Sequence, residues 1–300
     1  MAVKIPFVHE IDIEYGRVDQ VSPLIRRVTA NNPGGFTFKG TGTYIVGQGN
    51  VAVIDPGPLN EAHIAALLKA VEGETVTHVL ITHCHSDHSP AAAPFKAATG
   101  AKTYAYGPHG SGKPQDNVEV EAGADRDFVP DIEIRHGDVI EGDGWTVECV
   151  FTPGHTSNHM CFALREEKAL FSGDHVMGWS TTVVSPPDGD MATYMASLEL
   201  LLTRDDEIYW PTHGPAITEP KPFVQAYMDH RDDRERQIIE QISDGRATIP
   251  EMVPVMYAAV DPRLHAPAAR SVLAHLVRMV GDGRVTCDGG PDLKTTYRLA

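Results

Sequence analysis

Short apolar runs separated by turn residues dominate the first 220 residues and predict a β-rich region. The runs 43–46 and 51–54 flank Gly47-Gln-Gly-Asn50, a pattern that favours a hairpin. The run 76–81 is almost continuously apolar, as expected of a strand that is buried on both faces. Later runs are predicted to be strands as well, and they cover residues 103–106, 145–151, 160–164, 169–171 and 207–210.

Apolar positions spaced three and four residues apart predict helices between these strands. Residues 61–71 place four apolar side chains on one helical face, and helices are also expected over 89–98 and 192–202. This alternation of strand and helix occurs twice, which predicts an α/β domain with helices packed outside its sheets. The polar stretch 107–130, rich in Gly and Pro, is expected to be a long loop near a functional face.

Beyond residue 220 the pattern becomes helical. A long helix is predicted over 223–242, and Thr248-Ile-Pro-Glu251 has the spacing of a capping box that begins a second helix. A third helix is predicted over 267–280, followed by a hairpin that pairs residues 284–287 with 293–299. Three helices followed by a hairpin outline a winged helix. We therefore predict two domains, residues 1–220 and 221–300.

Composition narrows the class of protein. The chain has 300 residues, of which 42% are hydrophobic, with 27 Gly and 22 Pro, so collagen-like and disordered classes are excluded. It contains no run of 18 apolar residues and starts without an apolar run of signal length, so neither a transmembrane helix nor a signal peptide is expected. The four cysteines are far apart and form no Cys-x-x-Cys pair, which favours reduced thiols and a cytoplasmic location.

The negative charge of the chain is confined to its first part. Residues 1–220 hold 14 Lys and Arg against 30 Asp and Glu, whereas residues 221–300 hold 11 of each, so the whole net charge of −16 lies in the first 220 residues. Such an acidic field disfavours non-specific binding to nucleic acid. It does not exclude a locally positive site, because bound metal cations would reverse the local sign.

Histidine and aspartate gather just past the ends of the predicted strands. The motif His83-Cys-His-Ser-Asp-His88 directly follows the buried run 76–81, and three later strands end in short motifs that each contain one further His or Asp. Loops from the carboxyl ends of several strands can converge, so we expect these side chains to form one site. The candidate metal ligands are His83, His85, Asp87, His88, His155, Asp174 and His213.

Seven such ligands indicate two divalent cations. Neutral imidazoles and carboxylates suit Zn²⁺, and seven donors are too many for one tetrahedral site that keeps an open position. If one carboxylate bridges two metals, there is room between them for a hydroxide that can attack a substrate. We therefore predict two zinc ions, with iron or manganese as alternatives.

This pattern resembles the metallo-β-lactamase superfamily over roughly residues 30–220. The resemblance implies a four-layer αβ/βα sandwich, two sheets with helices on both outer faces. It also implies that His83, His85 and His155 bind the first metal and that Asp87, His88 and His213 bind the second, with Asp174 bridging. Asp87 would be the catalytic residue that orients the attacking hydroxide. Asp55 matches a position that supports the metal-binding loop without binding metal.

Departures from family patterns narrow the choice of subfamily. Asp174 occupies a position at which one large class of antibiotic-hydrolysing members has Cys, which disfavours β-lactamase activity of that class. Only 38 residues separate Asp174 from His213, too few for the insertion found there in the RNA-processing β-CASP relatives, which disfavours that subfamily as well. The C-terminal region resembles the winged-helix appendage of lactamase-β-like hydrolases, some of which are single-strand endoribonucleases. The stretch His230-Arg-Asp-Asp-Arg-Glu carries part of that resemblance.

Three functions follow from these observations. The first is a dinuclear zinc hydrolase in which a metal-bridging hydroxide attacks an ester-like centre of a small molecule, such as a thioester, ester or lactone. The alternative is cleavage of phosphodiesters in single-stranded RNA. The third is a metal-sensing DNA-binding module, which the scarcity of cations in the last helix disfavours, so we expect no specific duplex DNA partner. The C-terminal region is expected to pack beside the mouth of the active site or to form a contact in a homodimer.

Several neighbouring residues leave two or more interpretations open. Cys84 is expected to be a packed thiol and His109 to be exposed, whereas His159 and His175 either hydrogen-bond to ligands or pack in loops. Residues 178–191 either shape the substrate site or pack. Continuing the apolar stripe of the long helix places three charged residues on its buried side. They belong to a solvated connector, to an ion-pair network between the domains, or to a substrate contact, and they are Arg231, Arg234 and Glu235.

Overall fold

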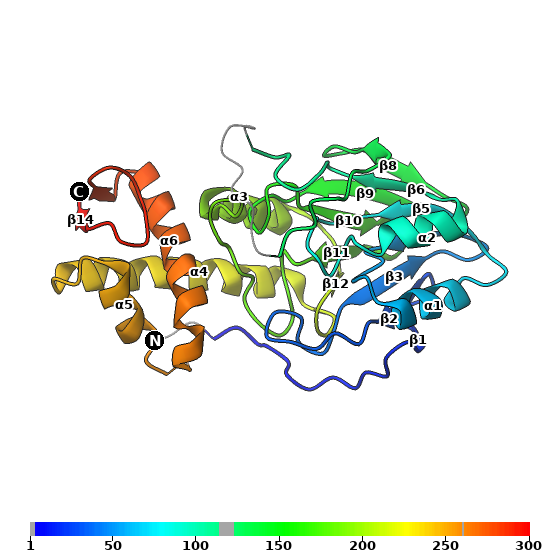
Figure 1. Ribbon diagram of the computed structural model, residues 1–300, viewed down its shortest axis with the longest axis horizontal. Helices are drawn as coiled ribbons and strands as arrows, with labels where there is room; N and C mark the ends of the chain where they lie inside the picture. Colours follow the sequence, from blue (N-terminus) through cyan, green and yellow to red (C-terminus); the bar gives the residue numbers. More distant parts are fainter. Residues whose placement is uncertain (1–3, 114–122, 260) are drawn as a thin grey trace.

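Two β-sheets packed face to face form the larger part of the molecule, on the right in Figure 1, in this computed structural model, which describes residues 4–113, 123–259 and 261–300. The first sheet has seven strands in the order β1 to β7, and its last four strands are parallel. These strands are β1 (Val18–Gln20), β2 (Ile25–Thr29), β3 (Gly42–Val46), β4 (Asn50–Ile54), β5 (Thr75–Leu80), β6 (Lys102–Ala105) and β7 (Ile132–Glu133).

The second sheet has five strands in the order β12-β11-β10-β9-β8, and only its β11–β12 pair is parallel. These strands are β8 (Val139–Glu141), β9 (Thr146–Phe151), β10 (Met160–Leu164), β11 (Ala169–Gly173) and β12 (Ile208–Pro211). The turn predicted between β10 and β11 is a single turn of 3₁₀ helix, Arg165–Glu167.

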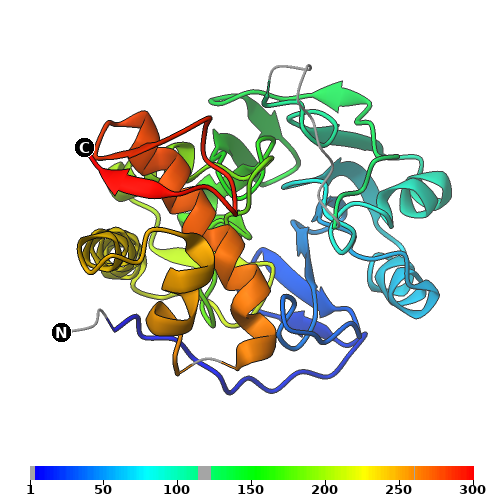
Figure 2. The same cartoon turned by 60° about the vertical axis from the view of Figure 1, so that its left-hand side comes forward.

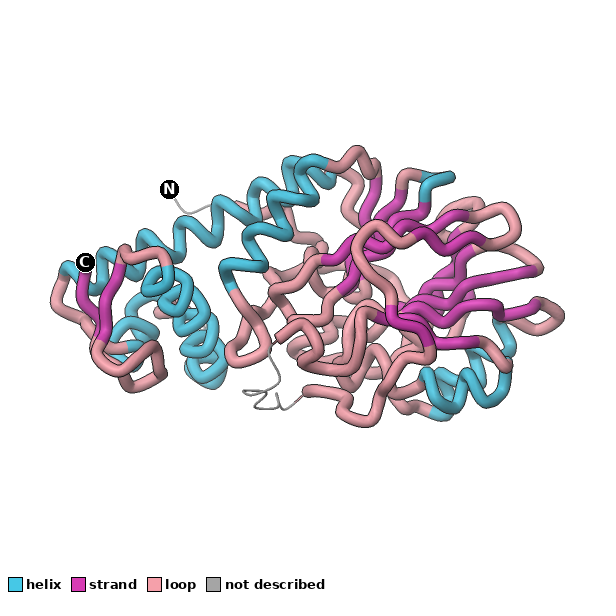
Figure 3. Tube along the Cα trace, turned by 90° about the horizontal axis from the view of Figure 1, so that it is seen from above, coloured by secondary structure: helices cyan, strands magenta, loops and turns pink. Residues whose placement is uncertain are grey.

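Helices cover both outer faces of the sandwich (Figure 3). The helices α1 (Glu61–Ala70) and α2 (Ala92–Thr99) pack on the first sheet, and α3 (Met191–Thr203) packs with the start of α4 (Pro220–Ser243) on the second. The predicted four-layer sandwich is therefore confirmed. Helix α2 begins at Ala92 rather than at the predicted residue 89, because residues 85–91 form the turn that carries the metal-binding motif.

The alternation of side chains along the strands divides the apolar residues between separate cores. In β3, Tyr44 and Val46 enter the core between the two sheets, whereas Ile45 enters the core beneath α1 and α2. The same period of two in β9 sends Cys149 between the sheets and Val150 toward α3 and α4. This division explains why every residue of β3 is buried.

The C-terminal region follows the predicted order of helices and hairpin. Helix α4 leads into α5 (Ile249–Met256) and α6 (His265–Gly281), and the hairpin pairs β13 (Val285–Cys287) with β14 (Tyr297–Leu299) (Figure 2). The capping box of Thr248 and Glu251 is present. The second hairpin strand is shorter than the predicted 293–299. This region has its own apolar core, which includes Ile238, Met252, Leu276 and Tyr297.

Four strands were not predicted, and each has a physical reason to escape a pattern of apolar residues. The strands β1, β7 and β8 are only two or three residues long and partly exposed. Strand β2 is interrupted by Arg26 and Arg27. The predicted long loop contains no helix or strand over 107–113 and 123–130, and its middle, 114–122, lies outside the described residues. No helix in the described ranges is long and apolar enough to cross a membrane.

Candidate metal centre

The seven predicted ligands lie together at one end of the sandwich. They come from the loops that follow β5, β9, β11 and β12, so both sheets contribute. Nε2 of His83 and Nε2 of His155 lie 2.9 and 3.2 Å from Nδ1 of His85. On the other side, Nε2 of His213 lies 3.2 Å from Oδ2 of Asp87 and 3.4 Å from Oδ1 of Asp174.

Their donor atoms fit divalent cations. Three groups of three residues each bring one donor atom from every member within 4.8 Å of one another, and these groups are His83, His85 and His155; His83, His88 and Asp174; and Asp87, His88 and His213. Nε2 of His88 and Oδ1 of Asp174 are buried without a hydrogen-bond partner. Buried polar atoms normally have one, so these atoms point to a bound group.

Hydrogen bonds at the opposite ring nitrogens set the histidine tautomers. Nδ1 of His88 faces Oδ2 of Asp55 at 2.9 Å, Nδ1 of His155 faces the Val183 carbonyl at 2.6 Å, and Nδ1 of His213 faces the Gly40 carbonyl at 3.2 Å. Each of these oxygens can only accept, so Nδ1 donates, and Nε2 is the ring nitrogen that faces the cluster and is available to a cation.

Opposite charges dominate the electrostatics of the cluster. Burial by itself would raise the pKa of the Asp87 and Asp174 carboxyls, but His88 and His213 more than offset it and hold both values below the ordinary range. Conversely, burial would lower the pKa of His213, whereas Asp174 and Asp87 raise it to about 10. Both carboxylates are therefore ionised at neutral pH. A bound cation would replace the protons on the histidines.

Asp55 supports the loop that carries the candidate ligands His83 to His88, as the resemblance implies. Its Oδ1 accepts a hydrogen bond from the Thr82 N–H (2.8 Å), and its Oδ2 accepts from the Thr82 hydroxyl (2.7 Å) and from His88. The hydroxyl of Thr212, which precedes the ligand His213, lies 3.3 Å from the same oxygen. Asp55 thus joins the loops after β5 and β12 without facing the centre of the cluster.

The loop that carries His155 is shaped by a glycine. Gly154 has a φ of 138°, and a Cβ at this position would lie 2.3 Å from Cα of Tyr194 in α3. Only glycine fits this conformation and this close approach. The Thr152-Pro-Gly-His155 motif therefore allows the backbone to turn against α3 and to direct His155 at the cluster.

The neighbours of the ligands have structural roles. Cys84 is a buried thiol, as predicted, and it accepts a hydrogen bond from the Asn158 amide at 3.1 Å. Nε2 of His159 accepts from the N–H of Asp174 (3.2 Å), so His159 positions the backbone of that ligand. His175 is fully buried beside the ring of Tyr194, with ring centroids 4.7 Å apart.

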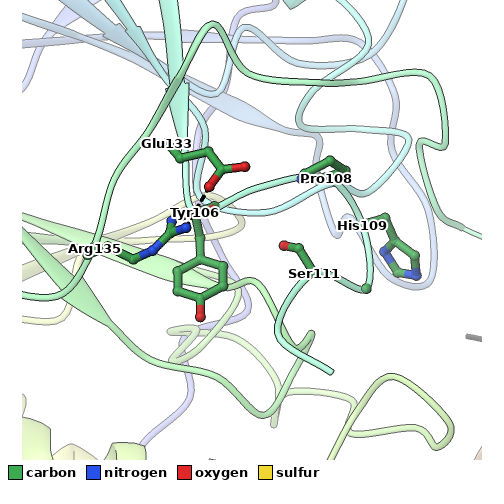
Figure 4. Close-up of a pocket in the computed structure, with 7 residues that line it drawn as sticks. Tyr106, Pro108, His109, Ser111, Glu133 and Arg135 are labelled. Atoms are coloured by element: carbon green, nitrogen blue, oxygen red, sulfur yellow. Dashed lines mark hydrogen bonds and ion pairs between the residues drawn. The ribbon is translucent and has the colours of Figure 1, made fainter. Parts of the chain in front are cut away.

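The prediction that His109 is exposed is wrong. Its ring is half-buried and lies 6.4 Å from the ring of His85. The reason is that residues 107–113 fold back toward the loop that carries His85. His109 also lines a pocket of about 620 Å³ together with Tyr106, Ser111, Glu133 and Arg135 (Figure 4). The Arg135 guanidinium lies over the Tyr106 ring and pairs with Glu133.

The charged residues of α4 are not a solvated connector. Arg231 is only 3% exposed, and its Nη2 donates to the Thr182 carbonyl of the first domain at 2.5 Å. Glu235 is 2% exposed and pairs with Arg278 and Arg284 inside the C-terminal region. Arg234 lies over the Tyr257 ring. The described residues do not form the ion-pair network between the two parts of the chain, because Glu235 pairs within the C-terminal region; Arg231 instead contacts the residues before 220 through a hydrogen bond to a backbone carbonyl.

Sequence reasoning missed the polar residues that adjoin the ligands. The Thr41 hydroxyl lies 3.2 Å from Oδ2 of Asp87, and Asn32 binds both the hydroxyl and the N–H of Thr41. Arg135 and Tyr106 of the pocket were missed as well. No local pattern marks these residues, because each reaches the site from a loop whose path depends on the packing of the sheets.

This fold and this cluster define a class of protein. The family model of the metallo-beta-lactamase superfamily matches residues 37–213, and that of the beta-lactamase associated winged helix domain matches residues 248–292. The chain therefore belongs to the metallo-beta-lactamase superfamily and is a hydrolase of that class. Members of the superfamily generally bind metal ions.

Relatives and solved structures agree with this assignment. The chain is 30% identical to the lactamase-like protein adaB of Aspergillus niger, over 100% of this chain and 97% of that protein. It is 32% identical to an atrochrysone carboxyl ACP thioesterase of Aspergillus chevalieri, over 89% and 84% of the two chains. A beta-lactamase domain protein from Burkholderia ambifaria has the same fold, with a TM-score of 0.76, 21% identity and coverage of 95% and 94%.

Proposed function

We propose that this protein is a dinuclear metal hydrolase that cleaves a thioester, ester or lactone of a small or carrier-bound substrate. The observation that carries the proposal is the buried cluster of seven donors, in which Nε2 of His88 and Oδ1 of Asp174 lack hydrogen-bond partners. His83, His85 and His155 would hold the first metal, Asp87, His88 and His213 would hold the second, and Asp174 would be the seventh ligand. Zinc suits this donor set, with iron and manganese as alternatives.

Two such cations supply Lewis acidity and lower the pKa of bound water. The side chains supply orientation and proton transfer. The Asp87 side chain is 20% exposed and that of Asp174 is 10% exposed, so Asp87 is the more accessible of the two carboxylates. Its Oδ2 is also close to the Thr41 hydroxyl, which fixes its direction. We assign Asp87 the role of orienting the attacking water and accepting its proton.

A thioester is the substrate class best supported among the three. The relative from Aspergillus chevalieri is named a thioesterase that acts on an acyl carrier protein, and it is similar over most of this chain. The pocket beside His85 offers hydroxyl, imidazole and guanidinium groups to the part of a substrate that lies away from the scissile bond. The acidic charge of the first 220 residues agrees with a substrate other than nucleic acid.

We also propose that the chain divides near Pro220 into a catalytic unit, residues 1–220, and a C-terminal winged-helix unit, residues 221–300. The separate apolar core that includes Ile238 and Leu276 supports this division. Helix α4 serves both units, because its first half packs Phe223 and Val224 against the second sheet.

The test combines metal analysis with a substrate panel. Protein loaded with zinc is expected to retain about two equivalents per chain, and to hydrolyse acyl thioesters faster than lactones, β-lactams, phosphodiesters or single-stranded RNA. A His85→Ala variant is the control for contaminating activity. Retention of well under one equivalent of zinc, iron or manganese would contradict the metal centre. Zinc-dependent cleavage of RNA by the wild type, without cleavage by His85→Ala, would contradict the proposed thioesterase activity and support a nuclease.

A further inference from the structure

A short loop connects two parts of the candidate metal centre. It begins at the ligand Asp174 and ends at Val183, whose carbonyl holds Nδ1 of the ligand His155. The loop is closed on itself, because the Thr182 hydroxyl lies 2.8 Å from the Asp174 carbonyl and 3.0 Å from the His175 carbonyl. A displacement of this loop would therefore move Asp174 at one end and, at the other end, the Val183 carbonyl that bonds to His155.

Helix α4 holds this loop from the outside. The Tyr227 hydroxyl lies 2.6 Å from the carbonyl oxygens of Met177 and Ser180, and it accepts a hydrogen bond from the Met177 N–H at 3.1 Å. One turn further along α4, Nη2 of Arg231 donates to the Thr182 carbonyl. This carbonyl lies in the Thr182–Val183 peptide, so the bond fixes the backbone one peptide unit before the one that presents the Val183 oxygen to His155.

Arg231 is buried in an unusual way for a cation. Its guanidinium lies over the Tyr194 ring, 5.2 Å from the centroid, and bonds to the Thr182 carbonyl, and among the described residues no carboxylate pairs with it. Its Nε is buried without a partner. Burying a charge without a counter-ion costs free energy. A purely structural contact at this position could be made by an apolar side chain, so the charge and its bond to Thr182 call for another explanation.

We propose that Arg231 is a positioning residue for the metal centre, acting through the Thr182–Val183 peptide on His155 and through the closed loop on Asp174. This role rests on the proposed function, since it requires that His155 and Asp174 bind metal. Through this bond the C-terminal region completes the metal site rather than acting as a separate module. Partners that orient a metal-binding histidine commonly change metal affinity by about 10–100-fold when they are removed.

Zinc affinity measured by competition with a chelator tests this role in the full-length protein. Arg231→Met removes the donor and keeps the bulk, whereas Arg231→Lys keeps a charge and one donor. Arg234→Met is the matched control, because Arg234 lies on the same helix but contacts Gln237, Tyr257 and the Met256 carbonyl instead of the loop. Urea unfolding of the metal-free variants separates zinc affinity from stability.

We expect Arg231→Met to bind zinc about 10-fold more weakly than the wild type, with partial recovery in Arg231→Lys and no change in Arg234→Met. Tyr227→Phe, which removes the other contact from α4, is expected to show a smaller loss and serves if Arg231→Met does not fold. Wild-type affinity in folded Arg231→Met or in Tyr227→Phe would overturn the positioning role and leave the metal centre intact. Failure of the wild type to bind zinc would overturn the proposed function and this role together.

Discussion

Two buried carboxylates in this protein, Asp174 and Glu235, differ in how completely their oxygen atoms are hydrogen-bonded. At the candidate metal centre, Nε2 of His88 and Oδ1 of Asp174 are buried without a hydrogen-bond partner, and they lie 3.6 Å from each other. In the C-terminal region, both carboxylate oxygens of Glu235 are occupied: Oε1 by His275 and Arg278, and Oε2 by Arg284. The carboxylate of the second cluster is complete within the protein, and that of the first is not.

The difference separates a site that binds from a site that stabilises. A buried carboxylate with all its donors in place joins the elements that supply them, in this case α4, α6 and the residue that precedes β13. A cluster with unsatisfied nitrogen and oxygen atoms at its centre gains its missing contacts from a ligand. Changes in the two clusters should therefore affect different measurements.

Loss of a metal ligand is expected to give the largest effect. His85→Ala should lower zinc-dependent hydrolysis by more than about 100-fold, since removal of even indirect partners costs about 10–100-fold. The free energy of unfolding of the metal-free protein should change by less than about 1 kcal/mol, because His85 is only partly buried. Steady-state kinetics and urea unfolding provide the two measurements. Hydrolysis by His85→Ala at the wild-type rate would contradict the assignment of His85 as a metal ligand.

Removal of the Glu235 carboxylate should have the opposite effect: a large loss of stability with no change in zinc binding. Glu235→Ala is expected to destabilise the protein by about 3 kcal/mol, the lower end of the range for a broken buried pair, because Arg278 and Arg284 are partly exposed and can turn to solvent. Zinc stoichiometry should remain that of the wild type. Urea unfolding and metal analysis test both expectations. A loss of zinc in folded Glu235→Ala would show that the two clusters are coupled.

The Glu235 cluster should also make the stability of the protein depend on pH, through His275. Burial lowers the pKa of His275 to about 4, from an ordinary value of 6.5, although Glu235 acts in the opposite direction. The unfolded chain therefore binds a proton between pH 6.5 and 4 that the folded chain does not, and stability falls as the pH falls through this range. His275→Gln should remove up to about 1 kcal/mol per pH unit of this dependence in metal-free protein. If the free energy of unfolding of His275→Gln and of the wild type changed in parallel with pH, the lowered pKa of His275 would be contradicted.

Replacement of the thiol beside the ligands is expected to give the smallest effect. Burial raises the pKa of Cys84 to about 12, although Asn158 acts in the opposite direction, so the thiol is protonated at neutral pH, and its contacts are with the Asn158 amide and the Gly107 carbonyl. Cys84→Ala should keep the wild-type zinc content and lose about 1 kcal/mol of stability. In the native protein, an alkylating reagent should modify the half-exposed Cys287 long before Cys84. Rapid modification of Cys84 would contradict its packing.

Much of the fold could be predicted because apolar runs mark buried strands directly. The runs that became β3, β4, β5 and β10 are buried on both faces, so few polar residues interrupt them. The short and partly exposed β1 and β8 escaped prediction because such strands exist only by pairing with a neighbour. The capping box at Thr248 was visible because its two residues are local in sequence.

By itself, the sequence determined which side chains gather at one end of the sandwich, because ligands that follow the carboxyl ends of buried strands must share an edge. Only the tertiary structure decided what holds them there. Val183 and Gly40 face their histidines from segments 28 and 173 residues away, and Arg231 reaches Thr182 across 49 residues. Such contacts depend on how two sheets and α4 pack together, and the periodicity of a single segment does not encode that packing.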